Sequence, residues 1–496
     1  MLFLFTPFFI FLRDFGDLTQ VFSIFDKRTA MIFRNTFLQA LFSVIISFII
    51  SIAPAVYISK KNNFLSKLIE QTIFIPFFFP VISTVISFSI LYTISNNSIR
   101  SLFFYNIFSV VAAHTFYNSP IFVKYIGDAL KRIPVEIIEG AKCDGASNFK
   151  ILFFIELPII KRTIARAAFM VFVYSFMSFA VVLSMGGIKY SSFETAIAAT
   201  LNADGDFVRA ALYAVFQFVF IKIIAAILNK SEKYELNENR NIREENVGII
   251  IKLGALFFTF MEYFIIIVGI TASFYNFYIG RFDFSGIINL FSYEFIKEQK
   301  ILESILNSLL LSLTASIFVT FFAYILLKTR NKATDIIVMG AMGISTSFFA
   351  ISIFYLNVVY QIPFFILVAL GYIMTMVPIS YNYLYRYING FDKTIVEASI
   401  TDGADSFQRF RYIEFPIVFP NLLGSIMQIF AIAFGEFTIV YTMQIQDYLP
   451  VSSVTNYSLF SQRYYMEGSA LSFINIVVIF VLFYISNNIS KKEFNK

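Results

Sequence analysis

The sequence predicts an all-α protein that crosses a lipid bilayer about twelve times, in two parallel halves of six helices each. Three observations predict this fold: a membrane-type composition, apolar runs long enough to span a bilayer, and one segment that occurs twice. Hydrophobic residues make up 58% of the 496 residues and charged residues 14%, against about 45–50% and about 25% in soluble domains. Soluble multidomain, disordered and fibrous proteins are therefore excluded.

The charged and catalytic residue types exclude several function classes. Lys and Arg number 38 and Asp and Glu 32, a net charge of +6. In a membrane protein this excess belongs in cytoplasmic loops, so we expect no nucleic-acid partner. The single cysteine, Cys143, cannot form an internal disulfide, and no Cys/His cluster exists to hold a metal. With one histidine, His114, and no tryptophan, we expect neither catalytic residues nor a bound metal.

The predicted spans follow in order along the chain. Residues 1–12 are apolar but too short for a comfortable span, and they lack the basic start and cleavage site of a signal peptide. We expect a short first helix, with a truncated or misassigned start as one explanation of its length. The other eleven spans are long enough to cross the bilayer. They are expected at 37–59, 71–94, 101–123, 167–188, 207–229, 250–272, 304–327, 336–356, 361–381, 421–441 and 468–487.

Basic residues predict the orientation. They collect after the second, fourth, eighth and twelfth spans, which strict alternation places on one side of the membrane, and that side is the cytoplasm. Both termini are then cytoplasmic, and loops 13–34 and 273–302 face outward. These basic residues include Lys60, Lys61, Lys67, Lys131, Arg132, Lys142, Lys150, Lys161, Arg162, Arg166, Lys328, Arg330, Lys332, Lys491, Lys492 and Lys496.

A charged linker divides the chain. Residues 230–246, KSEKYELNENRNIREEN, carry nine charged side chains in seventeen positions, which is typical of a solvated connection between bundles. We therefore expect a first repeat at 1–229, a cytoplasmic linker at 230–247 and a second repeat at 248–496.

A duplicated segment lies between the fourth and fifth spans of each half. Ile137–Ile159 and Ile395–Ile417 are identical at ten of 23 positions at a constant offset of 258, where composition alone would give about two. The same offset pairs Pro120 with Pro378 and Phe179 with Phe437. Equal spacing and equal sidedness indicate a parallel repeat.

The duplicated segment predicts two short helices joined at a fixed elbow. In the first copy a helix carrying Glu139 runs to Gly145, which can adopt the left-handed conformation that ends a helix. Ser147 is a candidate N-cap for a second helix, which we expect to stop before Pro158. The second copy has Glu397, Gly403, Asp405 and Pro416 at these positions. Such an elbow can transmit a push from a partner to the flanking spans; the alternative is a turn that merely orders the loop.

These segments resemble the EAA loop, E-A-A-x3-G-x9-I-x-L-P, of permease subunits in binding-protein-dependent ABC importers. Glu139, Gly145, Ile155, Leu157 and Pro158 fit the first copy, and Glu397, Ala398, Gly403, Ile413 and Pro416 fit the second. The departures are Gly140, Ser399 and Phe415, which are small or apolar replacements.

The resemblance implies a fold of two MetI-like repeats, no enzymatic activity of its own, and a place in the cytoplasmic membrane. It also implies that each loop docks on an ATP-hydrolysing subunit and that an extracytoplasmic binding protein delivers the substrate. The sequence has no nucleotide-binding motif G-x-x-x-x-G-K-[ST]. ATP would therefore bind to a separate subunit, of which a homodimer would suffice, and no cofactor is expected on this chain.

The resemblance covers nearly the whole chain and suggests a substrate. Residues 178–201 and 433–443 look like stretches of fused permeases for thiamine and for ferric iron. Met185-Gly186-Gly187 in combination with Ser192–Ile197 leans toward the thiamine type. Asn35-Thr36 and Asn307-Ser308 match a recurring Asn-Ser pair.

Glu436 and Ser178 are the candidate pathway residues. Glu436 replaces Ser178 of the first repeat, and an ionisable group inside a span is costly and commonly functional. A carboxylate there could attract a cationic substrate; the alternative is a carboxylate bonded to packing neighbours. Glu262 is expected to be a packing or interface residue, and His114 a buried, hydrogen-bonded one.

Two rival functions remain open at this point. A secondary transporter with twelve helices is also built from parallel halves, but it would normally carry a Gly-Asp-Arg type motif between spans two and three, which SKKNNFLSKLIEQ (59–71) lacks. An intramembrane enzyme would need a nucleophile, a base or metal ligands, for which the sequence offers no plausible set.

Overall fold

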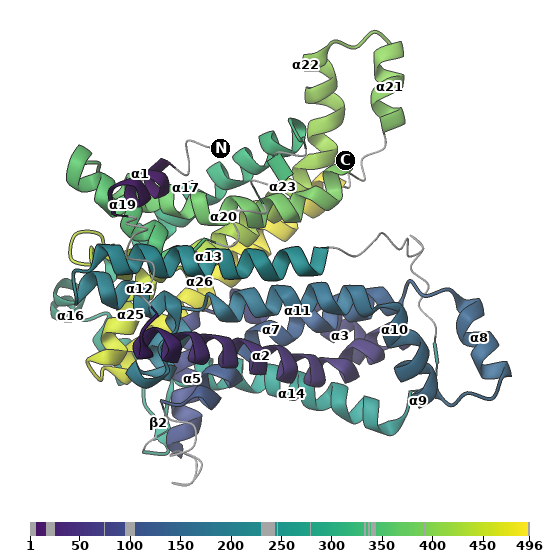
Figure 1. The fold of residues 1–496 in the computed structure, drawn as a ribbon, viewed down its shortest axis with the longest axis horizontal. Coiled ribbons are helices and arrows are strands. Elements are labelled where there is room, and N and C mark those ends of the chain that lie inside the picture. The colour runs from purple at the N-terminus through teal and green to yellow at the C-terminus, as the bar shows by residue number, and fades with distance from the viewer. Residues whose placement is uncertain are drawn as a thin grey trace.

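Long helices running side by side make up most of the structure (Figure 1). The computed structural model describes residues 6–15, 25–73, 75–94, 105–229, 244–245, 247–277, 279–331, 334–335, 338, 344–389 and 393–494. In these ranges seven helices are long and apolar enough to cross a membrane, and two further apolar helices are shorter. A small antiparallel hairpin pairs β1 (Tyr275–Asn276) with β2 (Arg281–Phe282). The predicted all-α membrane fold is confirmed.

The helices of the first half begin with the expected short one, since α1 (Thr6–Phe15) has ten residues. Residues 1–5 and most of the predicted linker, 230–243 and 246, lie outside the described residues. The remaining elements of this half are α2 (Lys27–Lys60), α3 (Phe64–Thr72), α4 (Ile75–Phe78), α5 (Val81–Ile94), α7 (Ile107–Leu130), α8 (Val135–Cys143), α9 (Asn148–Ile151), α10 (Leu157–Ile159), α11 (Lys161–Phe176), α12 (Phe193–Asn202) and α13 (Phe207–Asn229).

The second half repeats the order of long helices. Part of the span predicted at 336–356 lies outside the described residues, and its helix is described from Thr346. The elements are α14 (Ile249–Thr271), α15 (Ser285–Leu290), α16 (Tyr293–Glu298), α17 (Ile301–Lys328), α19 (Thr346–Tyr360), α20 (Phe364–Asn389), α21 (Lys393–Thr401), α22 (Ser406–Arg409), α23 (Phe415–Phe434), α24 (Thr438–Met443), α25 (Ser452–Ser461) and α26 (Tyr465–Phe494).

Three spans that the sequence predicts as continuous are broken. The span expected at 71–94 is divided among α3, α4 and α5 near Pro76 and Pro80, because proline has no N–H to donate within a helix. The spans expected at 167–188 and 421–441 end early, at Phe176 and Phe434, which are equivalent positions of the repeat. Apolar composition does not distinguish a continuous helix from one that breaks inside the protein, where non-helical backbone is shielded from lipid.

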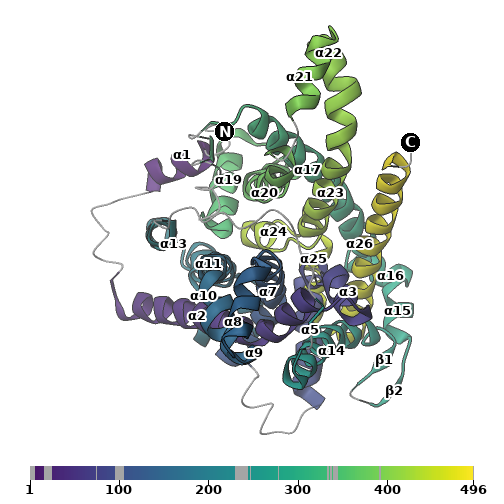
Figure 2. The same cartoon turned by 90° about the vertical axis from the view of Figure 1, so that its right-hand side faces the viewer.

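The two halves exchange their first helices. Ala255 and Phe258 of α14 are buried in the same core as Val56 and Ile58 of α2, so the first helix of the second half packs on the first half. In the opposite direction, the Phe11 ring of α1 meets the Phe348 ring of α19 edge-on at 5.1 Å. Figure 2 shows α1 beside α19 and α14 beside α5. Each repeat is therefore not a separate bundle, and the halves are held together by their cores.

Candidate functional site

The first elbow has the predicted local structure. Gly145 has φ +79°, and the N–H groups of Ala146 and Gly145 donate to the carbonyls of Ala141 and Lys142, each at 3.0 Å. This pair of bonds is the Schellman motif, which requires a left-handed residue and so favours glycine. Ser147 then caps α9 by accepting from the N–H of Lys150. The roles predicted for Gly145 and Ser147 in the turn are confirmed.

The second elbow has the same geometry. Gly403 has φ +80°, and the N–H groups of Ala404 and Gly403 donate to the carbonyls of Ser399 and Ile400 at 3.0 Å. Asp405 caps α22 in a reciprocal capping box, in which its carboxylate accepts from the N–H of Gln408 at 2.8 Å. Both copies thus stabilise one bent conformation, and Figure 1 shows α8–α9 projecting at the right and α21–α22 at the top.

The prediction that the second elbow helix stops before the proline is wrong in both copies. A π-helical turn occupies Leu152–Glu156 in the first copy and Phe410–Glu414 in the second, and the helix then continues through Pro158 and Pro416. In the π-turn the N–H of Leu157 donates to the carbonyl of Leu152. The proline then lies in the first turn of a new α-helix, where a missing N–H costs little.

Each elbow is tied to its bundle by an ion pair that the sequence reasoning missed. Lys60, at the end of α2, lies 2.9 Å from the Glu156 carboxylate. Lys328, at the end of α17, lies 2.6 Å from the carboxylate of Glu414. The signal was available, because both glutamates are identical positions of the repeat and both lysines end the equivalent span. Each ion pair therefore connects an elbow to the span that carries the Asn-Thr or Asn-Ser pair.

The outer surface of each elbow exposes large apolar side chains at equivalent positions. The exposed fractions are 66% for Phe149 and 72% for Phe407, and 74% for both Phe154 and Tyr412. Glu139, Gly145 and Pro158 are also exposed, as are Gly403 and Pro416. The side chain of Glu397, in α21, lies outside what the structure describes. Apolar groups that protrude together at a polar surface typically mark a contact with another protein.

The Asn-Thr and Asn-Ser pairs have equivalent partners in the two halves. Asn35 donates to the Lys189 carbonyl at 2.9 Å, and Thr36 accepts from the N–H of Phe193 at 3.1 Å. In the second half Asn307 donates to the Pro450 carbonyl at 3.0 Å, and Ser308 accepts from the N–H of Ser452 at 2.7 Å. The pairs therefore position the loops that lead into α12 and α25.

Glu436 follows the end of α23 and bends back onto the next helix. Its carboxylate accepts from the N–H groups of Thr438 at 2.8 Å and Ile439 at 3.1 Å, and so caps α24. Within the described part of the chain no lysine or arginine forms an ion pair with it. Ser178, its counterpart, accepts from the Ser192 hydroxyl through its carbonyl at 3.2 Å.

Four aromatic rings meet beside Glu436, and we call them the aromatic cluster: Phe179, Phe437, Tyr441 and Tyr457. The Phe179 ring lies 6.0 Å from that of Phe437 and 5.8 Å from that of Tyr441. The Tyr457 ring lies 5.2 Å from Phe437 and 5.5 Å from Tyr441. Sequence reasoning matched Phe179 with Phe437 as repeat partners and did not place them in contact.

A further contact between the halves is made by Glu194, and sequence reasoning missed this role. Its side chain is fully buried and accepts from Gln217 at 2.6 Å, from the Ser345 hydroxyl at 3.0 Å and from the N–H of Ser347 at 3.1 Å. The two serines stand at the start of α19 in the other half. A buried carboxylate is stable only when such donors surround it.

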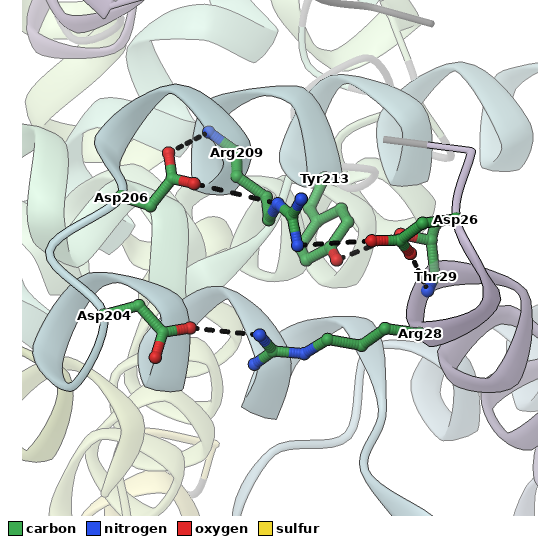
Figure 3. Close-up of polar contacts among 7 residues, drawn as sticks. All are labelled: Asp26, Arg28, Thr29, Asp204, Asp206, Arg209 and Tyr213. Carbon is green, nitrogen blue, oxygen red and sulfur yellow. Dashed lines mark hydrogen bonds and ion pairs between the residues drawn. The ribbon is translucent and has the colours of Figure 1, made fainter. Parts of the chain in front are cut away.

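A polar cluster at the N-terminus of α2 joins that helix to the loop between α12 and α13 (Figure 3). Asp26 caps α2 by accepting from the N–H of Thr29 at 2.7 Å, and this bond, with nearby Arg209, lowers the pKa of Asp26 below its ordinary value. Arg209 lies 3.3 Å from Asp26, and Arg28 lies 3.1 Å from Asp204. Arg209 is thus paired with acidic neighbours.

The two other ionisable candidates are hydrogen-bonded packing residues, as expected. Ser119 donates to Glu262 at 3.1 Å, and His114 Nδ1 lies 3.2 Å from the Ser43 hydroxyl in the core. Over the described ranges no group of three or more His, Cys, Asp or Glu side chains is arranged to hold a metal ion.

Comparison with known proteins identifies the family. The chain matches the family described as "Binding-protein-dependent transport system inner membrane component" twice, over residues 29–234 and 313–493. The first segment ends within the linker and the second lies beyond it, and together they cover most of the chain. Membership in this family favours the importer permease over the secondary transporter.

Individual relatives are similar over shorter stretches. The chain is 35% identical over 116 residues to the thiamine transport system permease protein ThiP of Escherichia coli, covering 23% of this chain and 22% of that protein. It is 26% identical over 144 residues to ThiP of Haemophilus influenzae, covering 29% of this chain and 26% of that protein. It is 24% identical over 190 residues to the probable transport system permease protein NifC of Clostridium pasteurianum, covering 36% of this chain and 66% of that protein.

The matched stretches thus span about a quarter of the length of the thiamine permeases. The broken spans, the twin elbows and the two family matches all indicate a chain of two fused repeats. The chain therefore belongs to the family of binding-protein-dependent transport system inner membrane components, as a fused, two-repeat ABC permease of the multi-span type.

Proposed function

We propose that this chain forms the translocation pathway of an ATP-driven importer and that its two elbows are the docking points for a pair of identical ATPase subunits. The single observation that carries this proposal is the equivalence of the elbows. Each has a left-handed glycine, a capped second helix, an ion pair to its bundle, and exposed aromatic residues at equal repeat positions.

The exposed apolar residues give the elbows their docking chemistry. Covering Phe149 and Phe154 on one elbow, and Phe407 and Tyr412 on the other, removes large apolar side chains from water, which stabilises a complex by about 25 cal/mol per Å². Glu139 and Glu397 would lie near basic groups of the ATPase. A symmetric ATPase pair presents the same groove to each elbow, as two equivalent elbows require.

The mechanism needs no covalent chemistry on this chain. ATP binding closes the ATPase pair and brings the elbows together, and the ion pairs Lys60–Glu156 and Lys328–Glu414 transmit this movement to α2 and α17. The pathway then changes from open to the cytoplasm to open to the outside, where a docked binding protein releases its ligand. The permease is a two-state element that partners at its two faces bias in opposite directions.

The orientation and the substrate complete the proposal. The elbows and both termini lie in the cytoplasm, and the hairpin β1–β2 faces outward, because the basic residues border the elbows. The substrate is thiamine, supported by the ThiP relatives; iron(III) is the second candidate, and Glu436 suits a cation in either case.

The test is reconstitution. The chain is purified with the ATPase and binding protein of its own operon or genome neighbourhood, placed in proteoliposomes, and supplied with ATP inside. We expect uptake of radiolabelled thiamine that requires ATP, with ATP hydrolysis stimulated by the loaded binding protein. Uptake driven by an ion gradient without ATP would instead identify a secondary transporter and overturn the proposal.

A further inference from the structure

The aromatic cluster lies where the two repeats face each other. Phe179 and Phe437 are equivalent residues of parallel repeats, and their rings lie 6.0 Å apart. Parallel repeats are related by an axis along the membrane normal, and a residue can contact its own equivalent only close to that axis. In the proposed transport function the permeating molecule passes between the repeats, which places the aromatic cluster on its route.

The route is closed at this point in the structure. Phe179 and Phe437 are only 4% and 2% exposed, and each ring is in contact with another ring of the cluster. Because Phe179 belongs to the first half and the other three rings to the second, a separation of the halves parts Phe179 from its neighbours. The same separation uncovers the ring face of Phe179 in the first half and ring faces of the cluster in the second half.

Among the residues that the structure describes, no lysine or arginine forms an ion pair with Glu436, the residue next to the ring of Phe437 in the chain. Glu436 precedes Phe437 directly and is partly buried, and its oxygens accept backbone N–H groups of α24. Aromatic ring faces attract cations through the ring quadrupole, most strongly when water is excluded. Rings and one carboxylate together are therefore complementary to a flat, positively charged organic molecule.

We propose that the aromatic cluster and Glu436 form a recognition site for a ring-bearing organic cation, exposed when the two halves separate at Phe179. This inference rests on the proposed transport function and deepens it, because it selects an organic cation over a bare metal ion. A hard ion such as iron(III) would bind through oxygen atoms, which here are those of Glu436 and the hydroxyls of Tyr441 and Tyr457.

Ring faces and oxygen ligands can be separated by substitution. Tyr441→Phe and Tyr457→Phe remove the hydroxyl and keep the ring, whereas Tyr441→Leu and Tyr457→Leu remove both. Tyr448→Leu is the matched control, since Tyr448 is 77% exposed and its ring lies 5.4 Å from that of Phe364, outside the cluster. Thiamine and iron(III) citrate are the probes, in proteoliposomes that contain the complete transporter.

We expect the phenylalanine variants and Tyr448→Leu to import thiamine within about twofold of the unaltered complex, and each cluster leucine variant to lose about tenfold or more. All of them should copurify with the ATPase in the same ratio as the unaltered chain, which shows that they fold and assemble. Uptake of iron(III) that the phenylalanine variants abolish would overturn the inference in favour of oxygen ligation.

Other outcomes distinguish failure of the recognition site from failure of the transport function. Equal thiamine uptake by the leucine and phenylalanine variants, or ATP-driven uptake of neither probe by the unaltered complex, would overturn the recognition site but leave the transport function standing. Failure of the chain to associate with an ATPase would remove the transport function itself, and that association is measured separately by copurification.

Discussion

Phe179 and Phe437, 258 residues apart in the sequence, face each other with ring centroids 6.0 Å apart and an angle of 37° between the ring planes. This contact between equivalent residues shows where the axis of the duplicated architecture passes. The elbows lie far from this axis. Each elbow is joined to one end of the helix that follows it in the chain, α11 or α23, and the ring contact lies beyond the other end of that helix (Figures 1 and 2). Movement of the elbows must therefore be carried along these helices to act on the ring contact.

A first prediction concerns that contact. With Cys143→Ser removing the single native thiol, the pair Phe179→Cys and Phe437→Cys is linked by a short bis-thiol reagent. We expect linkage to abolish substrate uptake, because the halves can no longer part at the axis, and we expect reduction of a cleavable linker to restore it. The measurement is uptake before and after linkage. Full uptake by the linked protein would mean that the halves do not separate here.

A second prediction concerns the coupling carboxylates. The double variant Glu139→Lys and Glu397→Lys should insert normally but lose uptake, since both residues are expected to face basic groups of the ATPase. The single variant Glu136→Lys, one helical turn away on the same elbow helix, is the matched control for added positive charge. Unaltered transport by the double variant would refute the coupling role.

A third prediction compares the two ion pairs at the elbows. The side chains of Lys60 and Glu156 are 13% and 5% exposed, while those of Lys328 and Glu414 are 44% and 23% exposed. Lys60→Met leaves a buried carboxylate unpaired and should destabilise by about 3–5 kcal/mol. Lys328→Met should cost only about 0–1 kcal/mol, because water screens the more exposed pair.

Thermal unfolding in detergent or nanodiscs measures this difference, and Lys60→Met with Glu156→Gln should recover part of the loss. Equal melting temperatures for the two single variants would show that the Lys60–Glu156 pair does not hold the elbow.

A fourth prediction concerns Asp26 and pH. Its pKa is lowered from 3.8, first by the N–H of Thr29 and further by Arg209, so the contribution of its charge is present above the ordinary pKa and is lost as the pH falls through the lowered one. Asp26→Asn keeps a capping oxygen, whereas Asp26→Ala removes it at a cost of about 1 kcal/mol.

We therefore expect Asp26→Asn to melt slightly below the unaltered protein at pH 7, and this gap to close below about pH 4. Asp26→Ala should stay lower than Asp26→Asn at both values. If the difference in melting temperature between the unaltered protein and Asp26→Asn persists unchanged at acidic pH, the stabilisation does not come from the charge of Asp26.

A fifth prediction concerns Glu194. Glu194→Gln keeps the shape of the side chain but replaces one of its two acceptor oxygens by an NH2 group, so that either Gln217 or the pair of Ser345 hydroxyl and Ser347 N–H loses its acceptor. Leaving buried polar groups unsatisfied costs about 1–3 kcal/mol each. We expect a lower melting temperature together with weaker association of the halves. The measurement is copurification of residues 1–229 and 248–496 expressed as separate chains, and undiminished association would contradict this role.

The sequence was sufficient to predict the repeat, the turns and the all-α membrane class. Each of these depends on local chemistry: a left-handed turn favours glycine at 145 and 403, a helix start favours Ser147 or Asp405, and a span needs a long apolar run. The family membership followed from the same residues, since the EAA-like positions coincide with the matched repeats.

What the sequence did not predict depends on tertiary contacts. The π-turns ahead of Pro158 and Pro416 replace the expected helix ends, because a shift of one hydrogen bond lets the helix continue. The breaks at Phe176 and Phe434 are invisible in an apolar run. The partners of Glu194, Lys60 and Phe179 come from segments far away in the sequence, and periodicity holds no information on such pairings.

The most direct test of the central claim is site-specific cross-linking. A photoreactive benzophenone side chain is placed at position 149 or 407 on the elbows, and at position 284, where the exposed Phe284 precedes α15. In membranes containing the complete transporter we predict cross-links to the ATPase subunit from 149 and from 407, and none from 284. Cross-links from position 284 to the ATPase, or none from either elbow, would contradict the claim that the elbows are the docking points for the ATPase.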